Sequence, residues 1–124
     1  MQKSVLLIDD DNEDQEIFIQ QLAQYNPGIK VISAYNGNDA LQLLSKTNPS
    51  YIFLDVNMPG MNGIDVLKKI KEKTTSDIPV FMYSTSDGFK TKSIAYNLGV
   101  RQYFRKPDSE NGFRSIFSTV FQGN

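Results

Sequence analysis

Acidic side chains follow two apolar runs of this chain at the point where each run ends. The run of aspartates Asp9–Asp11 comes directly after Val5–Ile8, and Asp55 comes directly after Tyr51–Leu54. Carboxylates that lie close together repel one another unless a cation joins them. Because the chain has no histidine and no cysteine, its available metal ligands are oxygens, which favour a hard ion such as Mg²⁺. Asp11 or Asn12 is also a suitable helix cap, but a cap needs one residue and leaves two aspartates unexplained.

Two later runs end in a hydroxyl group and in a basic side chain. Ser84 follows the run Val80–Tyr83, and Lys106 comes shortly after Gln102–Phe104. A carboxylate, a divalent cation, a hydroxyl and an ammonium at one point could hold a phosphoryl group, with Asp55 as the covalent acceptor. Taken singly, Ser84 could be a turn residue and Lys106 a surface lysine. The hypothesis therefore depends on these residues meeting in space.

Apolar runs alternate with helical patterns along the chain, which is typical of βαβ units and a parallel sheet. Val5–Ile8, Tyr51–Leu54 and Val80–Tyr83 are continuous apolar runs and suit central strands, whereas Lys30–Ala34 and Gln102–Phe104 are more mixed and suit less central positions. Capping residues and apolar spacing predict five helices between and after these strands. They begin near Asp11, Asn38, Gly63, Thr91 and Phe113 and end near Tyr25, Lys46, Lys73, Leu98 and Phe121. The first of them carries the apolar residues Ile17, Phe18, Leu22 and Tyr25.

This (βα)₅ order predicts the α/β class: a flavodoxin-like, doubly wound parallel five-stranded sheet with strand order 2-1-3-4-5 and helices on both faces. Right-handed crossovers fix the face that each helix covers. In such sheets ligands bind outside the carboxyl ends of the strands, at the switch point between the first and third strands. The aspartates that follow these two strands are therefore expected to lie together.

Length and composition limit the classes of protein that this chain could represent. The 124 residues suffice for one compact domain, so we expect residues 1–124 to form one domain with no output domain. A formal net charge of −1 gives no reason to expect a nucleic-acid or membrane surface. The N-terminal apolar run is too short for a signal peptide or a membrane span, which predicts a cytoplasmic protein. The lack of histidine and cysteine excludes Ser-His-Asp hydrolysis, disulfides and thiol catalysis.

Four segments resemble the receiver domain of bacterial two-component response regulators, and in particular the single-domain, chemotaxis-regulator type. They are VLLIDDD, FLDVNMPGMNG, IPVFMYSTS and YFRKP, in the family's order, and the resemblance covers essentially the whole chain. It implies a stand-alone response regulator, not an enzyme, that accepts a phosphoryl group from a histidine kinase or phosphotransfer protein. The regulator would then bind an output protein, either as a monomer or as a phosphorylation-dependent dimer.

The resemblance also implies roles for individual residues. Asp55 is similar to the family's phosphoacceptor, and Asp9 and Asp10 are similar to the acidic pair that holds Mg²⁺, with Mn²⁺ as an alternative ion. The main-chain carbonyl of Asn57 matches the backbone ligand of that metal. Ser84 matches the residue whose hydroxyl binds the phosphoryl oxygens, and Lys106 matches the lysine that pairs with them.

Further positions follow from the same resemblance. Tyr103 looks like the switch aromatic that turns inward when Ser84 is drawn to the phosphoryl group, and the Lys106–Pro107 peptide bond is expected in the cis form. Asn57, Thr85 and Ser86 are expected to modulate access to the phosphoryl group and its lifetime. An output surface is expected on the fourth helix, the fifth strand and the fifth helix. We place on it, as an alternative to an ordinary solvated face, Phe89, Lys92, Tyr96, Arg101, Gln102 and Arg105.

Three other classes of protein share features with this sequence. A haloacid-dehalogenase-type phosphatase also uses a strand-end aspartate with Mg²⁺, but it needs an acid two positions later, where this chain has Asn57. A pseudo-receiver that binds partners without phosphorylation would lack the acceptor, the acidic pair or the lysine, and all of these are present. A flavodoxin-like cofactor protein would need a Gly-rich phosphate loop after the first strand, where the three aspartates stand instead.

Overall fold

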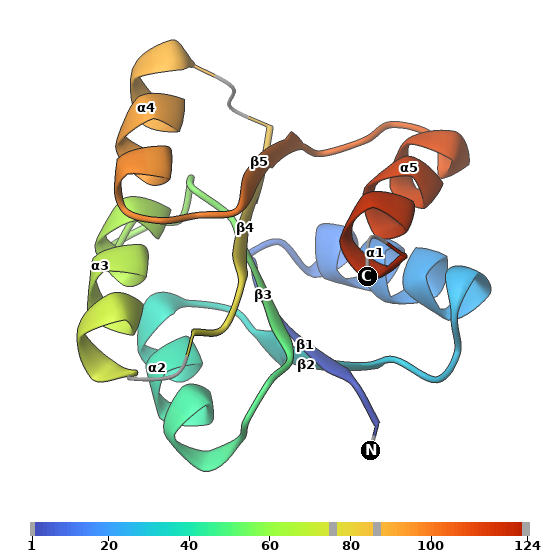
Figure 1. Ribbon diagram of the computed structural model, residues 1–124, viewed down its shortest axis with the longest axis horizontal. Coiled ribbons are helices and arrows are strands. Elements are labelled where there is room, and N and C mark those ends of the chain that lie inside the picture. The colour runs from blue at the N-terminus through green and yellow to red at the C-terminus, as the bar shows by residue number, and fades with distance from the viewer. Residues whose placement is uncertain (1, 75–76, 86–87, 123–124) are drawn as a thin grey trace.

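A computed structural model describes residues 2–74, 77–85 and 88–122 of the chain (Figure 1). Strands and helices alternate through these residues, as the hydrophobic pattern predicts. The strands are β1 (Ser4–Ile8), β2 (Lys30–Ala34), β3 (Tyr51–Leu54), β4 (Val80–Ser84) and β5 (Gln102–Arg105). The helices are α1 (Asn12–Tyr25), α2 (Gly37–Lys46), α3 (Gly63–Lys73), α4 (Phe89–Asn97) and α5 (Glu110–Phe121).

The five strands form one parallel sheet in the order β2-β1-β3-β4-β5. The predicted flavodoxin-like topology is therefore confirmed, with the two more mixed strands at the edges. β4 and β5 each extend one residue beyond the predicted end, because Ser84 pairs with Arg105 in the last step of their register. This added step brings the hydroxyl residue and the residue before Lys106 to the same edge of the sheet.

The helices cover the two faces of the sheet, with α1 and α5 on one side and α2, α3 and α4 on the other (Figure 1). Alternate side chains of each strand enter opposite cores, as the pleat requires. In β1, Val5 and Leu7 pack with α1 and α5, while Leu6 and Ile8 pack under the other three helices. Burial on both faces explains why the central strands are continuous apolar runs.

The core beneath α1 and α5 is mainly aromatic. The Phe18 ring makes edge contacts with the rings of Phe53, Tyr83 and Phe117, with centroid distances of 5.1, 5.5 and 5.3 Å. Of the apolar residues that the first helix carries, Ile17 is 43% exposed. The inward stripe of α1 instead has helical spacing through Gln15, Phe18 and Leu22, all of which are buried.

Close approach of α3 to β3 sets the backbone just beyond Asp55. The Gly63 amide donates a hydrogen bond to the Val56 carbonyl at 2.8 Å, and a Cβ on Gly63 would collide with the main-chain carbonyl oxygen of Asp55. Glycine at this first helical position therefore allows α3 to begin directly against the end of β3. Among the residues that the structure describes, no helix is long and apolar enough to cross a membrane.

Candidate phosphoacceptor site

The backbone of the sheet places two carboxylates at the switch point. The Asp9 amide donates to the Ala34 carbonyl at 3.0 Å and the Asp55 amide donates to the Ile8 carbonyl at 2.9 Å. Each aspartate therefore continues the ladder of its strand by one hydrogen bond, and its side chain emerges where the sheet ends. This geometry follows from the parallel register of β1 with β2 and β3.

Three carboxylates form a cluster that fits a divalent cation. One oxygen each of Asp9, Asp10 and Asp55 lies within 4.8 Å of the others. Asp9 and Asp55 are buried and Asp10 is exposed, so the cluster lies at the rim of the sheet with one side toward solvent. All three donors are carboxylate oxygens, which suit Mg²⁺ or Mn²⁺, and an ion with few protein ligands keeps water or phosphate oxygens in its other positions.

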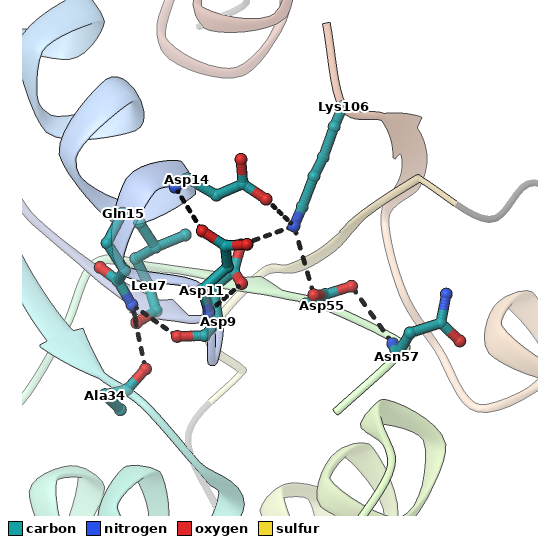
Figure 2. Close-up of polar contacts among 9 residues, drawn as sticks. All are labelled: Leu7, Asp9, Asp11, Asp14, Gln15, Ala34, Asp55, Asn57 and Lys106. Carbon is teal, nitrogen blue, oxygen red and sulfur yellow. Dashed lines mark hydrogen bonds and ion pairs between the residues drawn. The ribbon is translucent and has the colours of Figure 1, made fainter. Parts of the chain in front are cut away.

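The Lys106 ammonium lies among the carboxylates (Figure 2). Its Nζ is 2.8 Å from an oxygen of Asp9, 2.8 Å from one of Asp14 and 3.3 Å from one of Asp55. Only 10% of the Lys106 side chain is exposed. The Lys106 amide donates to the Ser84 carbonyl at 2.9 Å, which continues the β4–β5 ladder and fixes the start of the side chain. The predicted meeting of Asp9, Asp55 and Lys106 is present in the structure.

Burial and pairing act against one another on these charges. Burial raises the pKa of Asp9 from its ordinary 3.8 to about 6, although hydrogen bonds from Lys106 and the Asp11 amide act to lower it. Burial lowers the pKa of Lys106, but hydrogen bonds to Asp14 and Asp9 and the negative charge of Asp55 outweigh burial, and the net pKa is raised. Lys106 is thus held as a charged ammonium. Because burial disfavours the ionised form of Asp9, a cation beside this carboxylate is favourable.

Two residues of the site, Asp14 and Gln15, were missed by the sequence analysis. The sequence pattern indicates for Asp14 only a place in the first turn of α1, where an acidic residue interacts favourably with the helix dipole. Its contact with Lys106 joins residues 92 positions apart, and no local pattern reveals such a pair. The buried Gln15 amide donates to the main-chain carbonyls of Leu7, Asp9 and Ala34 at 3.2, 3.1 and 3.0 Å (Figure 2). Its place on the apolar stripe of α1 was a signal that could have found it.

The other predicted phosphoryl-site residues lie around this cluster. Ser84 is fully buried at the end of β4, next to β3 in the sheet. Asn57 is exposed, and its amide donates to Asp55 Oδ1 at 3.2 Å. Thr85 is exposed and lines a cleft of about 550 Å³ whose wall includes Lys106 and Pro107. Ser86, a predicted modulator, lies outside the described residues.

The predictions for Tyr103 and Pro107 have different outcomes. Tyr103 is buried, its amide donates to Tyr96 Oη at 3.0 Å, and Lys92 Nζ lies 5.6 Å from the centre of its ring. The structure thus places the aromatic ring inward, and its switching role stays a prediction. The predicted cis form of the Lys106–Pro107 peptide bond is wrong: the bond is trans. Trans is the preferred isomer even before proline, and Lys106 reaches all three carboxylates with it.

Known proteins with similar sequences and structures have the same fold as this chain. Residues 5–117 match the family model of the response regulator receiver domain. The chain therefore belongs to this family of two-component signalling domains, whose members are generally signalling modules rather than enzymes and bind a divalent metal at the acidic cluster. Receiver domains of this family interact with histidine kinases or phosphotransfer proteins and with output partners.

Individual response regulators are similar to this chain in sequence or in structure. The sensory transduction protein LytT of Oceanobacillus iheyensis is 34% identical over 121 residues, which cover 97% of this chain and 48% of that protein. The chain spans about half the length of the curated relatives that it matches. The Mn²⁺-bound response regulator Rcp1 has a TM-score of 0.88 with 25% identity and coverage of 98% and 96% of the two chains. The phosphorylated cyanobacterial phytochrome response regulator RcpA has the same TM-score and identity, with coverage of 100% and 98%.

Proposed function

We propose that this chain is the receiver of a two-component phosphorelay and accepts a phosphoryl group on Asp55 with Mg²⁺. The observation that carries the proposal is the approach of the Lys106 ammonium to Asp55 within the cluster formed with Asp9 and Asp10. The chemistry is consistent with that of two similar regulators, one of which binds Mn²⁺ and the other of which is phosphorylated. The donor is a histidine kinase or a phosphotransfer protein.

Phosphoryl transfer at this site is a substitution at phosphorus. A carboxylate oxygen of Asp55 forms a bond to the phosphorus atom while the bond from phosphorus to the donor's histidine nitrogen breaks, and that nitrogen leaves with the electron pair. Asp9, Asp10 and Asp55, with the main-chain carbonyl of Asn57, would hold Mg²⁺, which offsets the charge on the phosphoryl oxygens. Lys106 and the Ser84 hydroxyl provide further positive charge and hydrogen bonding to those oxygens.

A cleft lined by Thr85, Lys106 and Pro107 lies beside the Lys106 ammonium that contacts Asp55. Thr85 is exposed beside Lys106, and the exposed Asn57 donates its amide to Asp55. We propose that these two residues and Ser86 tune the entry of donor and water and hence the lifetime of the acyl phosphate.

Small-molecule phosphorylation tests the proposal directly. Incubation with acetyl phosphate and Mg²⁺ should add one labile phosphoryl group to the intact protein, and chelation of the metal should prevent the addition. Asp55→Asn should abolish the adduct, whereas Asp65→Asn, a change at an exposed carboxylate of α3, should leave it unaltered. A wild-type protein that acquires no adduct, or an Asp55→Asn variant that keeps it, would show that the site has another purpose.

We further propose that signalling uses the face formed by α4, β5 and α5. Large apolar side chains are exposed on α4, where Phe89 is 85% exposed and Tyr96 is 47% exposed. Ser84 and Tyr103 are the proposed link between the phosphoryl group and this face, because movement of Ser84 would change the space beside β4 that the ring of Tyr103 can fill. Comparison of the Tyr103 rotamer with and without a beryllofluoride mimic tests this link, and an identical rotamer in both states contradicts it.

The organisation of the whole protein stays a prediction. We propose a cytoplasmic, single-domain regulator that binds an output protein and is monomeric or dimerises on phosphorylation. Gel filtration with light scattering, performed with and without the beryllofluoride mimic, distinguishes the two oligomeric states. The mass of the native protein in its own cells tests the single-domain organisation.

A further inference from the structure

The contact between Asp14 and Lys106 is not explained by the proposed transfer to Asp55. Lys106 Nζ is closer to Asp14, at 2.8 Å, than to Asp55, at 3.3 Å. Asp14 lies on α1 and belongs to none of the three positions whose oxygens form the metal cluster. Its position is fixed by the cap of the helix, because the Asp14 amide donates to Oδ1 of Asp11 at 3.1 Å.

The three carboxylates that pair with Lys106 differ in burial and in whether they belong to the candidate metal cluster. Asp9 and Asp55 pair with the lysine through carboxylates that also belong to the candidate metal cluster, and the side chains of both are almost fully buried. Asp14 is 33% exposed and lies outside the cluster. If Asp9 and Asp55 bound a metal ion, Lys106 would lose part of its pairing with them and would keep its pairing with Asp14.

We infer that Asp14 is a positioning residue that holds the Lys106 ammonium beside the site while Asp9 and Asp55 bind a divalent cation. The inference rests on the proposed function, since it assumes that the cluster binds Mg²⁺. Without Asp14, the Lys106 ammonium has only the two proposed metal ligands, Asp9 and Asp55, as anionic partners among the residues that the structure describes. Lysine and metal then compete for the same two carboxylates, and the affinity for Mg²⁺ falls.

Magnesium affinity in a double-mutant cycle tests this role. Isothermal titration with MgCl₂ is performed on the wild type, Asp14→Asn, Lys106→Met and the double variant, with Glu13→Gln as a control that removes one exposed negative charge from the same turn of α1. Asp14→Asn should weaken Mg²⁺ binding about threefold in the wild-type background, the size expected for a partly exposed ion pair. In the Lys106→Met background the same change should have no more effect than Glu13→Gln has in the wild type.

Equal weakening in both backgrounds would mean that Asp14 acts only through its charge, and it would overturn the inference. No weakening, or no Mg²⁺ binding by the wild type, would overturn it as well. If Asp55 forms the phosphoryl adduct but Asp14 and Lys106 show no coupling in Mg²⁺ affinity, the proposed function stands and the inference about Asp14 fails. If the two residues are coupled but no adduct forms, the inference stands and the proposed function fails.

A second measurement needs no Lys106 variant. Heteronuclear NMR of the lysine ammonium groups in the Mg²⁺-saturated proteins should show faster exchange of the Lys106 ammonium protons with water in Asp14→Asn than in the wild type. Glu13→Gln should match the wild type, and equal exchange in all three proteins would overturn the inference.

Discussion

Asp9 is a buried carboxylate, and its negative charge is unfavourable in the folded state unless a cation lies beside it. Because burial raises its pKa to about 6 from an ordinary 3.8, the folded state binds a proton more tightly than the unfolded state does. The contribution of Asp9 to stability is therefore greatest below about pH 4 and is lost as the pH rises toward 6. The aspartate is kept at a cost in the metal-free protein, which agrees with a role in binding a cation.

This sign leads to a prediction for Asp9→Asn in the absence of Mg²⁺. The free energy of unfolding of the variant, relative to the wild type, should increase between pH 4 and pH 6 by on the order of 1–3 kcal/mol. Urea denaturation in the presence of a chelator at several pH values measures this difference. Saturating Mg²⁺ should remove the advantage of the variant, because the metal stabilises the ionised form. A difference independent of pH would contradict the assigned pKa.

Gln15 joins the beginning of α1 to the ends of two strands. Its side-chain amide is the buried donor for the carbonyls of Leu7, Asp9 and Ala34. Gln15→Leu keeps an apolar body in the same place and removes these hydrogen bonds, so the free energy of unfolding should fall by about 1–3 kcal/mol. Gln20→Leu, an exposed change on the same helix, is the matched control. Similar urea midpoints for the two variants would show that the hydrogen bonds contribute little.

The start of α3 determines how firmly Asp55 is held. Gly63→Ala places a Cβ against the main-chain carbonyl of Asp55, so the helix or the strand end has to shift. We expect a loss of about 1–3 kcal/mol in the free energy of unfolding and slower formation of the Asp55 adduct. Gly88→Ala is the control, since a Cβ there meets no atom within 4 Å. Unchanged stability and phosphorylation in Gly63→Ala would mean that α3 moves freely away from β3.

The open edge of β5 is closed in part by a side chain of α4. Tyr96 Oη accepts the hydrogen bond of the Tyr103 amide at 3.0 Å, so the helix and the edge strand are joined at the residue proposed to switch. Tyr96→Phe should increase amide hydrogen exchange at Tyr103 and reduce stability by about 0.5–1.5 kcal/mol. Tyr35→Phe is the control, because Tyr35 is exposed to a similar degree, 43% against 47%. Equal exchange at Tyr103 in both variants would contradict a link through Tyr96.

The elements could be predicted to a greater extent than the contacts between them. Continuous apolar runs identified the three central strands, and strand-end residues such as Asp55 and Lys106 could be placed together because parallel strands end at one edge. The hydrophobic pattern alone did not show that Ile17 lies outside the buried face of α1. Ile17 and Phe18 are adjacent apolar residues, and the pattern does not fix which of them the helix turns toward the sheet. The Asp14–Lys106 pair depends on how α1 and the segment after β5 approach in space, which no local pattern records.

The molecule as a whole brings one ammonium and a cluster of carboxylates to the switch point of its sheet. Lys106 and a divalent cation are alternative sources of positive charge for Asp9 and Asp55. Lys106→Met should therefore lower the free energy of unfolding of the metal-free protein by about 3 kcal/mol, the usual result of removing one partner of a buried pair. Lys68→Met, at an exposed position of α3, should be close to neutral.

Addition of Mg²⁺ should reverse much of the loss caused by Lys106→Met. A ligand that binds only the folded state stabilises it in proportion to the logarithm of its concentration over its dissociation constant, and the variant has no ammonium to compete for Asp9 and Asp55. The melting temperature should thus rise more with Mg²⁺ in Lys106→Met than in the wild type or Lys68→Met, as differential scanning calorimetry can measure. Equal rises in all three proteins would mean that the lysine and the metal do not compete for these carboxylates. A larger rise in the variant would identify Lys106 as the residue that occupies the cation's place in the metal-free protein.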